Sequence, residues 1–217
     1  MPILPNAVIK QVSSEITKKK LLLVEGKDEI EFFKALLKNN SSLSRIKDDI
    51  QIVEIGGVDK FRHEIPALKN RTGFEQVEAI AIIRDSDGSQ ESAFMSICSI
   101  LSNNSLPRPT TQLKYTTNQI RVGIFIMPGN EEGTMLEDLC LKTQESHPIM
   151  SLTNRHIEEI ENNQSVETPK NLSKAKTLVF LASMPSIVNN LGLGAQRGYW
   201  NLEHESLNTL VNFLEGL

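Results

Sequence analysis

The 217-residue sequence has little cysteine and few aromatic residues, and it contains no long apolar segment. Its two cysteines, Cys98 and Cys140, lie far apart among apolar neighbours, which excludes a disulfide framework and favours two reduced, buried thiols. No apolar run approaches the roughly 20 residues that a membrane helix needs. The N-terminal stretch 1–5 lacks the basic and apolar regions of a signal peptide. We therefore expect a cytoplasmic protein without membrane contact.

Sequence patterns for nucleotide loops and for zinc sites are also absent. Neither Gly-x-x-x-x-Gly-Lys-Ser/Thr nor Gly-x-Gly-x-x-Gly follows an expected strand. The histidines have no ligand spacing, and we expect each to be structural or on the surface: His63, His147, His156 and His204. A zinc centre and a classical mononucleotide or dinucleotide site are thus not expected.

The charge is modestly acidic and unevenly distributed. The formal net charge is −4, which argues against a protein that coats nucleic acid nonspecifically. Residues 1–72 carry 13 Lys/Arg against 10 Asp/Glu, so the excess of acid lies in the remainder. The run Lys18-Lys19-Lys20 is either a solvated edge or a contact to a phosphate backbone. An acidic protein can still act on a polyanion, because a bound divalent metal changes the local sign of the charge.

The first half of the chain alternates short apolar runs with longer amphipathic segments. Strands are expected at 21–24, 50–55, 77–83 and 121–127, with helical segments between them, the second of these interrupted by Pro66. This order predicts an α/β fold with a Rossmann-like, parallel four-stranded sheet flanked by helices. In such sheets ligands bind beyond the carboxyl ends of the strands.

The second half has a different pattern, which predicts a C-terminal helical extension. Helices are expected at 134–142, 149–162, 169–184 and 204–214, with Pro169 in a first turn. Three glycines, Gly192, Gly194 and Gly198, suggest a loop before Tyr199 and Trp200. We expect this aromatic pair to close the extension onto the core, the alternative being that the pair stacks on a base together with Arg197. The predicted division is an α/β domain at 1–131 and an extension at 132–217 that shares its core.

Carboxylates follow two of the expected strands at the edge where ligands bind. Glu25 follows the first strand, and Asp85 and Asp87 follow the third. Mg²⁺ prefers oxygen ligands and needs only one or two carboxylates besides water and substrate phosphate. The pattern therefore predicts a Mg²⁺ site, which Mn²⁺ could also fill, for phosphodiester chemistry. The alternative is that these acids are turn residues and helix caps.

The spacing of these carboxylates resembles a known family. Val24-Glu25-Gly26-Lys27-Asp28-Glu29, followed by Ile82-Ile83-Arg84-Asp85-Ser86-Asp87-Gly88, is similar to the Toprim domain of topoisomerases, bacterial primases, OLD-family nucleases and small stand-alone proteins. The resemblance covers roughly residues 20–140. It implies a compact parallel sheet between helices. It also implies acid/base or metal-binding work for Glu25, and Mg²⁺ binding by Asp85 and Asp87.

Two further parts of the pattern carry open alternatives. The stretch 133–139, Gly-Thr-Met-Leu-Glu-Asp-Leu, resembles a segment of OLD-like proteins in which the glutamate contributes to a second metal site, so Glu137 and then Asp138 are candidates. Both also suit the first turn of a helix, where the dipole favours carboxylates. Lys27 is a candidate to neutralise a phosphate or a transition state, or is a solvated helix residue.

Within the resemblance, missing modules narrow the expected activity. There is no zinc cluster of the primase type, no ATPase segment in front and no room for a topoisomerase gate, so we expect a free-standing Toprim protein. Metal-dependent nicking or hydrolysis of DNA or RNA is the expected function. The alternative is a non-catalytic module that binds metal and nucleic acid or regulates an ATPase partner protein. A third reading is that metal only stabilises the fold.

Overall fold

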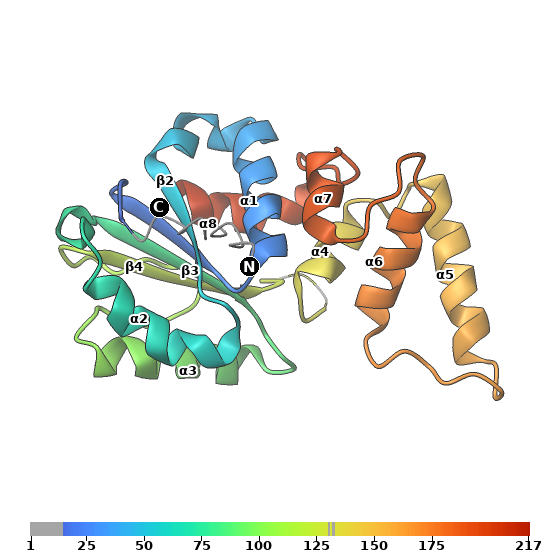
Figure 1. Cartoon of the computed structure of the whole chain (residues 1–217), viewed down its shortest axis with the longest axis horizontal. Coiled ribbons are helices and arrows are strands. Elements are labelled where there is room, and N and C mark those ends of the chain that lie inside the picture. The colour runs from blue at the N-terminus through green and yellow to red at the C-terminus, as the bar shows by residue number, and fades with distance from the viewer. Residues whose placement is uncertain (1–14, 130, 132) are drawn as a thin grey trace, which may run out of the picture.

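The structure, a computed structural model, describes residues 15–129, 131 and 133–217, and a four-stranded sheet forms its centre (Figure 1). All strand pairs are parallel and the order is β2-β1-β3-β4. The strands are β1 (Lys20–Val24), β2 (Ile50–Glu54), β3 (Ala79–Asp85) and β4 (Arg121–Met127). The predicted parallel α/β architecture is confirmed, with β3 beginning and ending two residues later than expected.

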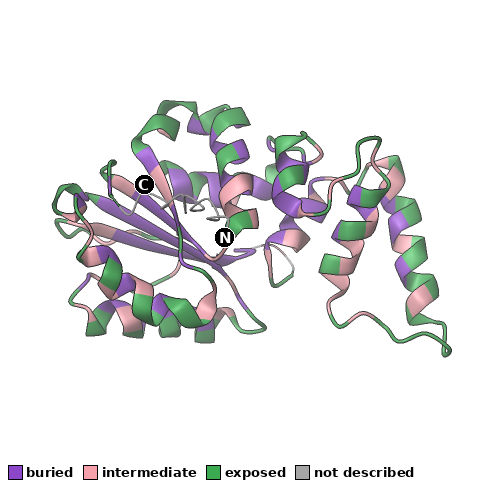
Figure 2. Cartoon of the chain, in the orientation of Figure 1, coloured by how far each residue is buried: buried purple, intermediate pink, exposed green. Residues whose placement is uncertain are grey.

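Helices cover both faces of the sheet, because alternate side chains of each strand point to opposite sides. Leu22 and Val24 belong to the core cluster beneath α1 and α8, whereas Leu21 and Leu23 belong to the cluster beneath α2 and α3. The helices are α1 (Lys27–Asn39), α2 (Phe61–Lys69), α3 (Gln90–Asn103) and α8 (Asn208–Glu215). Figure 2 shows the strands buried between these layers. This burial on both faces explains why the strand sequences are almost wholly apolar.

The C-terminal part is helical and returns to the sheet. It contains α4 (Leu136–Lys142), α5 (Pro148–Glu161), α6 (Leu172–Ala182) and α7 (Leu191–Gln196), followed by α8. Phe213 of α8 lies 5.4 Å from Phe125 of β4, measured between ring centroids. Arg121 donates to the backbone carbonyls of Gly216 and Leu217, at 2.8 Å each. The extension thus shares a core with the sheet, while α5 and α6 project from the body as what we call the arm (residues 148–182; Figure 1).

Three local predictions were wrong in detail. Gly192 and Gly194 lie in α7 rather than in a loop, because a Cβ on Gly192 would stand 2.7 Å from the Asp28 carbonyl oxygen and one on Gly194 would stand 2.8 Å from Leu181. Close packing of α7, rather than chain flexibility, selects these glycines. Pro169 precedes α6 by three residues instead of starting it. Pro66 lies inside a continuous α2.

Buried aromatic and thiol groups confirm two other expectations. Trp200 is buried, its ring is stacked on that of Phe180 with centroids 5.2 Å apart, and its Nε1 donates to the Leu191 carbonyl at 3.0 Å. It is therefore a core residue and cannot stack on a base. Cys98 and Cys140 are free and buried. Among the helices of the described residues, none has the length and apolar character needed to cross a membrane.

Candidate metal centre at the carboxyl edge of the sheet

Glu25 and Asp85 lie side by side at the carboxyl edge of the sheet, although 60 positions separate them in the sequence. The cause is the parallel pairing of β1 with β3, in which Leu23 is the register partner of Ile82. The two strands therefore end at the same edge of the sheet, and the residues that follow this pair reach that edge together. The backbone N–H of Asp85 donates to Glu25 Oε1 at 3.1 Å. The sheet thus brings together the two carboxylates that the strand ends predicted.

Burial and like charge make the ionised form of Asp85 unfavourable. Its Oδ1 accepts from the backbone N–H of Leu136, the first residue of α4, at 3.1 Å. Nevertheless, burial, followed by the charges of Glu25, Glu137 and Glu29, raises the pKa of Asp85 to about 8. A carboxylate in this position gains from a nearby positive charge.

Glu25 has a smaller shift in the same direction. Burial is the main reason that its pKa is raised to about 6, and the charges of Asp87 and Glu29 add to the rise. The hydrogen bond from Asp85 and the charge of Arg84 oppose it. Because a carboxyl with a pKa near neutrality exchanges its proton readily at pH 7, Glu25 is suited to acid/base work.

Two further glutamates face this pair, and one of them was missed by the sequence reasoning. Glu29 lies in the first turn of α1, four residues after Glu25, and burial raises its pKa. The signal that could have found it is this spacing, because a helix that begins at Lys27 carries Glu29 close to the strand end. Glu137, in the first turn of α4, also has a pKa raised by burial. We call Glu25, Glu29, Asp85 and Glu137 the acidic edge.

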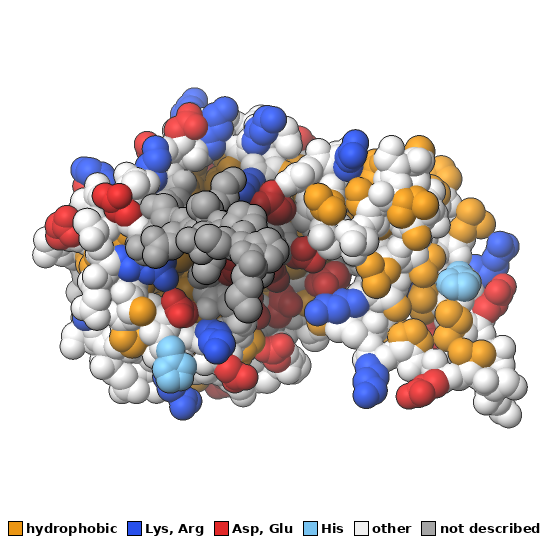
Figure 3. All heavy atoms as spheres, viewed as in Figure 1, with side chains coloured by type: hydrophobic (Ala, Val, Ile, Leu, Met, Phe, Trp, Pro, Cys, Tyr) orange, Lys and Arg blue, Asp and Glu red, His pale blue; other side chains and the backbone are white. Residues whose placement is uncertain are grey.

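A lysine from the arm partly balances the acidic edge. Lys174 of α6 has its Nζ 4.0 Å from Glu137 Oε1. Its charge lowers the pKa of Glu29 and of Glu137, against the larger effect of burial. Figure 3 shows acidic side chains gathered where the sheet body meets the arm. The extension therefore contributes charges of both signs to the same place.

Asp87 does not share the environment of Asp85. It has a backbone φ of +50°, and its side chain is 57% exposed. Its Oδ2 accepts from Arg84 Nη2 at 2.6 Å. Asp87 is thus paired with Arg84 and is more exposed than Asp85, although its charge still acts on Glu25.

Asp138 and Lys27 occupy different surroundings from the acidic edge. Asp138 Oδ2 accepts from the backbone N–H groups of Thr134 (2.8 Å) and Met135 (3.1 Å), and its Oδ1 accepts from the hydroxyl of Ser173. These contacts cap α4 and tie it to α6. Lys27 is exposed as the first residue of α1. Of the two neighbouring acids of α4, Glu137 is thus the one whose charge acts on Asp85.

A small hollow adjoins the acidic edge. It has a volume of about 330 Å³ and is lined by Glu25, Gly26, Glu29, Glu54, Gly56 and Gly57. The backbone N–H groups of Gly56 and Gly57 donate to the Glu25 carbonyl oxygen at 2.7 and 2.9 Å, and both glycines have positive φ, +90° and +112°. Glycine is the residue that adopts this conformation without strain. The loop after β2 is therefore held against the end of β1, beside the candidate site.

The acidic edge suits a hard divalent cation by its chemistry. Its donors are carboxylate oxygens, the ligands that Mg²⁺ prefers, and Mg²⁺ keeps several waters instead of requiring a cage of protein ligands. In the described part of the chain, no three acidic, histidine or cysteine side chains are grouped so that they could hold a metal ion. The predicted Mg²⁺ site thus depends on the pair Glu25 and Asp85, and water would have to supply the other ligands.

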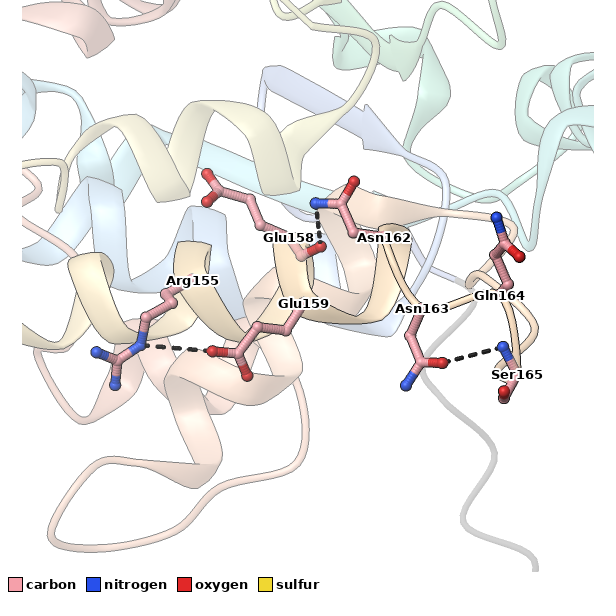
Figure 4. A pocket seen from close by; sticks show the side chains of 7 residues that line it. All are labelled: Arg155, Glu158, Glu159, Asn162, Asn163, Gln164 and Ser165. Carbon is pink, nitrogen blue, oxygen red and sulfur yellow. Dashed lines mark hydrogen bonds and ion pairs between the residues drawn. The ribbon is translucent and has the colours of Figure 1, made fainter.

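A larger hollow lies elsewhere and contains no predicted site residue. It measures about 620 Å³ at the end of α5 and is lined by Arg155, Glu158, Glu159, Asn162, Asn163, Gln164 and Ser165 (Figure 4). Its polar groups largely satisfy one another, as in the ion pair between Arg155 Nε and Glu159 Oε1 at 3.9 Å. All the residues that line it are exposed, so the acidic edge remains the candidate site.

Two of the histidines, each expected to be structural or on the surface, have capping roles. His147 Nδ1 accepts from the backbone N–H of Ile149 at the start of α5, and His204 Nδ1 accepts from that of Ser206. These contacts satisfy N–H groups that have no partner inside a helix. They agree with the structural role expected for both residues.

The fold and the site together define the chain as an α/β protein with acidic residues at the carboxyl edge of its sheet. The chain belongs to the family described as "Protein of unknown function (DUF3226)", whose sequence model matches residues 19–217. No curated protein matches the chain. Among solved structures, it is similar to the C-terminal region of the OLD protein of Xanthomonas campestris pv. campestris. The structure phased with iodine is 12% identical to this chain, the match covers 92% of this chain and 95% of that chain, and the TM-score is 0.47. The structure phased with platinum is 13% identical, the match covers 91% of this chain and 92% of that chain, and the TM-score is 0.38.

Proposed function

We propose that this chain is a small Toprim-type protein that carries out Mg²⁺-dependent nicking or hydrolysis of phosphodiesters in DNA or RNA. The observation that carries the proposal is the meeting of Glu25 and Asp85, joined by the 3.1 Å hydrogen bond from Asp85 N–H to Glu25 Oε1. The order of the sequence patterns, Glu25 and then Asp85-x-Asp87, supports it.

Each residue has a role that follows from its surroundings. Asp85 and Glu25 would hold Mg²⁺ or Mn²⁺, because both carboxylates are raised in pKa by burial next to like charge. A bound divalent ion supplies charge neutralisation at the phosphoryl group and orients water. If Glu25 does not ligate the ion, it would act instead as the general base, because a pKa of about 6 in the metal-free protein suits proton transfer near neutral pH. Lys27 is exposed at the start of α1 and would contact the phosphate backbone.

The test is a cleavage assay with variants at opposite edges of one sheet. The purified chain is incubated with single- and double-stranded DNA and RNA in Mg²⁺ or Mn²⁺. We expect cleavage to disappear in Asp85→Asn and to fall by about 100-fold in Glu25→Gln, since a positioned acid or base contributes at least that much. The matched controls Asp49→Asn and Glu78→Gln, exposed residues beside the amino ends of β2 and β3, should keep wild-type rates. Equal cleavage by Asp85→Asn and Asp49→Asn would contradict the proposal.

A second candidate function is a module that binds metal and nucleic acid, or an ATPase partner, without cleaving. The observation that favours it is the ion pair between Asp87 and Arg84, in which one of the two predicted aspartate ligands already has a partner. In the same experiment, a metal-dependent mobility shift of the oligonucleotide without any cleaved product would select this function.

A further inference from the structure

Arg84 places a permanent positive charge beside the acidic edge. It lies in β3, and its side chain is only 5% exposed. Its Nε donates to the Asp85 carbonyl oxygen at 3.1 Å and stands 3.8 Å from Glu25 Oε1. A guanidinium group does not lose its proton in proteins. Any cation that enters between Glu25 and Asp85 therefore meets this charge at close range.

The same guanidinium holds Asp87. Arg84 Nη2 contacts Asp87 Oδ2 at 2.6 Å, a short, charge-assisted hydrogen bond. One end of the pair is buried, but the Asp87 side chain is 57% exposed, so water reaches the bond and can replace it. Asp87 thus lies next to the candidate metal site, and its carboxylate is paired with Arg84.

We propose that Arg84 competes with the divalent cation for Asp87. In the metal-free protein the guanidinium holds the Asp87 carboxylate, and metal binding requires that this ion pair be exchanged for a metal–carboxylate contact. The inference rests on the proposed metal site. It adds that the cation affinity is set by this exchange as much as by the acidic edge itself.

The exchange predicts that removing the guanidinium tightens metal binding. Arg84→Met deletes the positive charge and frees Asp87, whereas Arg84→Lys retains a charge but loses the planar fork. If Arg84 instead supported the site, for example by orienting Asp87 while Asp87 ligated the metal, Arg84→Met would weaken binding. The two roles therefore give changes of opposite sign.

The experiment is a calorimetric titration of Mn²⁺ into the full chain at pH 8, with folding of each variant checked by circular dichroism. We expect Arg84→Met to lower the Kd for Mn²⁺ by about tenfold, because close charge pairs couple with energies of this order. Arg84→Lys should remain near the wild type. In an Asp87→Asn background, Arg84→Met should have a clearly smaller effect, since no carboxylate remains to be released. Arg84→Gln, a second neutral variant, serves if Arg84→Met does not fold.

The outcomes separate this inference from the function on which it rests. If the wild type binds Mn²⁺ and Asp85→Asn does not, but both neutral Arg84 variants bind as weakly as the wild type or more weakly, the competition is overturned and the metal site remains. An effect of Arg84→Met that is equally large with and without Asp87 also overturns it. If neither the wild type nor any of the variants binds Mn²⁺, the proposed metal function itself fails.

Discussion

The two edges of the sheet treat their charges in opposite ways. At the amino edge, Lys19 Nζ lies 2.6 Å from Glu78 Oε1, and both side chains are about three-fifths exposed (61% and 60%). The pKa of Glu78 is lowered, first by its hydrogen bond to Lys19 and then by the charge of that residue. At the carboxyl edge, Glu25 and Asp85 are packed together with raised pKa values. One edge has matched charges in water, whereas the other retains a repulsion that a ligand can relieve.

The largest expected effect is a pH dependence that comes from the carboxyl edge. The folded-state pKa values of Glu25 (about 6) and Asp85 (about 8) lie above their ordinary values, so the folded protein binds these protons more tightly than the unfolded chain. Their contribution to stability is complete below about pH 4 and is lost as the pH rises through 6 and 8. We expect a loss on the order of a few kcal/mol between pH 5 and pH 9.

Thermal melts in EDTA over this pH range measure the effect. Added Mg²⁺ should restore much of the lost stability at pH 9 and little at pH 5, because protonated carboxyls do not bind the ion. A stability that rises steadily from pH 5 to pH 9 in EDTA would contradict the repulsion at the carboxyl edge.

The next effect isolates Asp85. At pH 8.5 in EDTA, Asp85→Asn should raise the melting temperature by about 5 °C, since it removes the buried charge and retains an oxygen that can accept from Leu136. It should also abolish the response to Mg²⁺. The control Asp49→Asn makes the same chemical change at the amino edge and should leave the melting temperature in place.

A smaller effect separates two neighbouring acids of α4. Asp138→Ala should destabilise the chain by about 1–2 kcal/mol, because Asp138 accepts from the N–H groups of Thr134 and Met135. Glu137→Ala should not destabilise the metal-free protein at pH 8.5, because it removes a charge that raises the pKa of Asp85. Chemical denaturation compares the two. Equal losses in both variants would show that Glu137 is also structural.

The smallest effect belongs to the amino edge. Glu78→Gln breaks an ion pair between two exposed side chains, and such pairs contribute little because water and salt screen them. We expect no measurable change in melting temperature at 0.15 M salt. A clear destabilisation would mean that the two edges differ less than their exposure indicates.

The sequence predicted those features that depend on strand order. The bounds of β4 at Arg121–Met127 agree with the expected strand, and the meeting of Glu25 with Asp85 follows from parallel pairing alone. The contact between Arg84 and Asp87 was not predicted, because it depends on a turn with positive φ at Asp87. The cap made by Asp138 depends on Ser173 of α6, which only tertiary packing brings near. The order and the ends of the strands determine which residues reach the edge, but not the contacts that their side chains make there.

Lys174 links the position of the arm to the electrostatics of the acidic edge. The residue lies near the start of α6, and its ammonium group stands 4.0 Å from Glu137 Oε1. Coulomb energy varies inversely with distance, so a shift of α6 by a few ångströms would change the electrostatic potential that Lys174 produces at Glu137 and Glu29. A displacement of α6 relative to the sheet would therefore change the proton affinity of these two carboxylates at the strand ends.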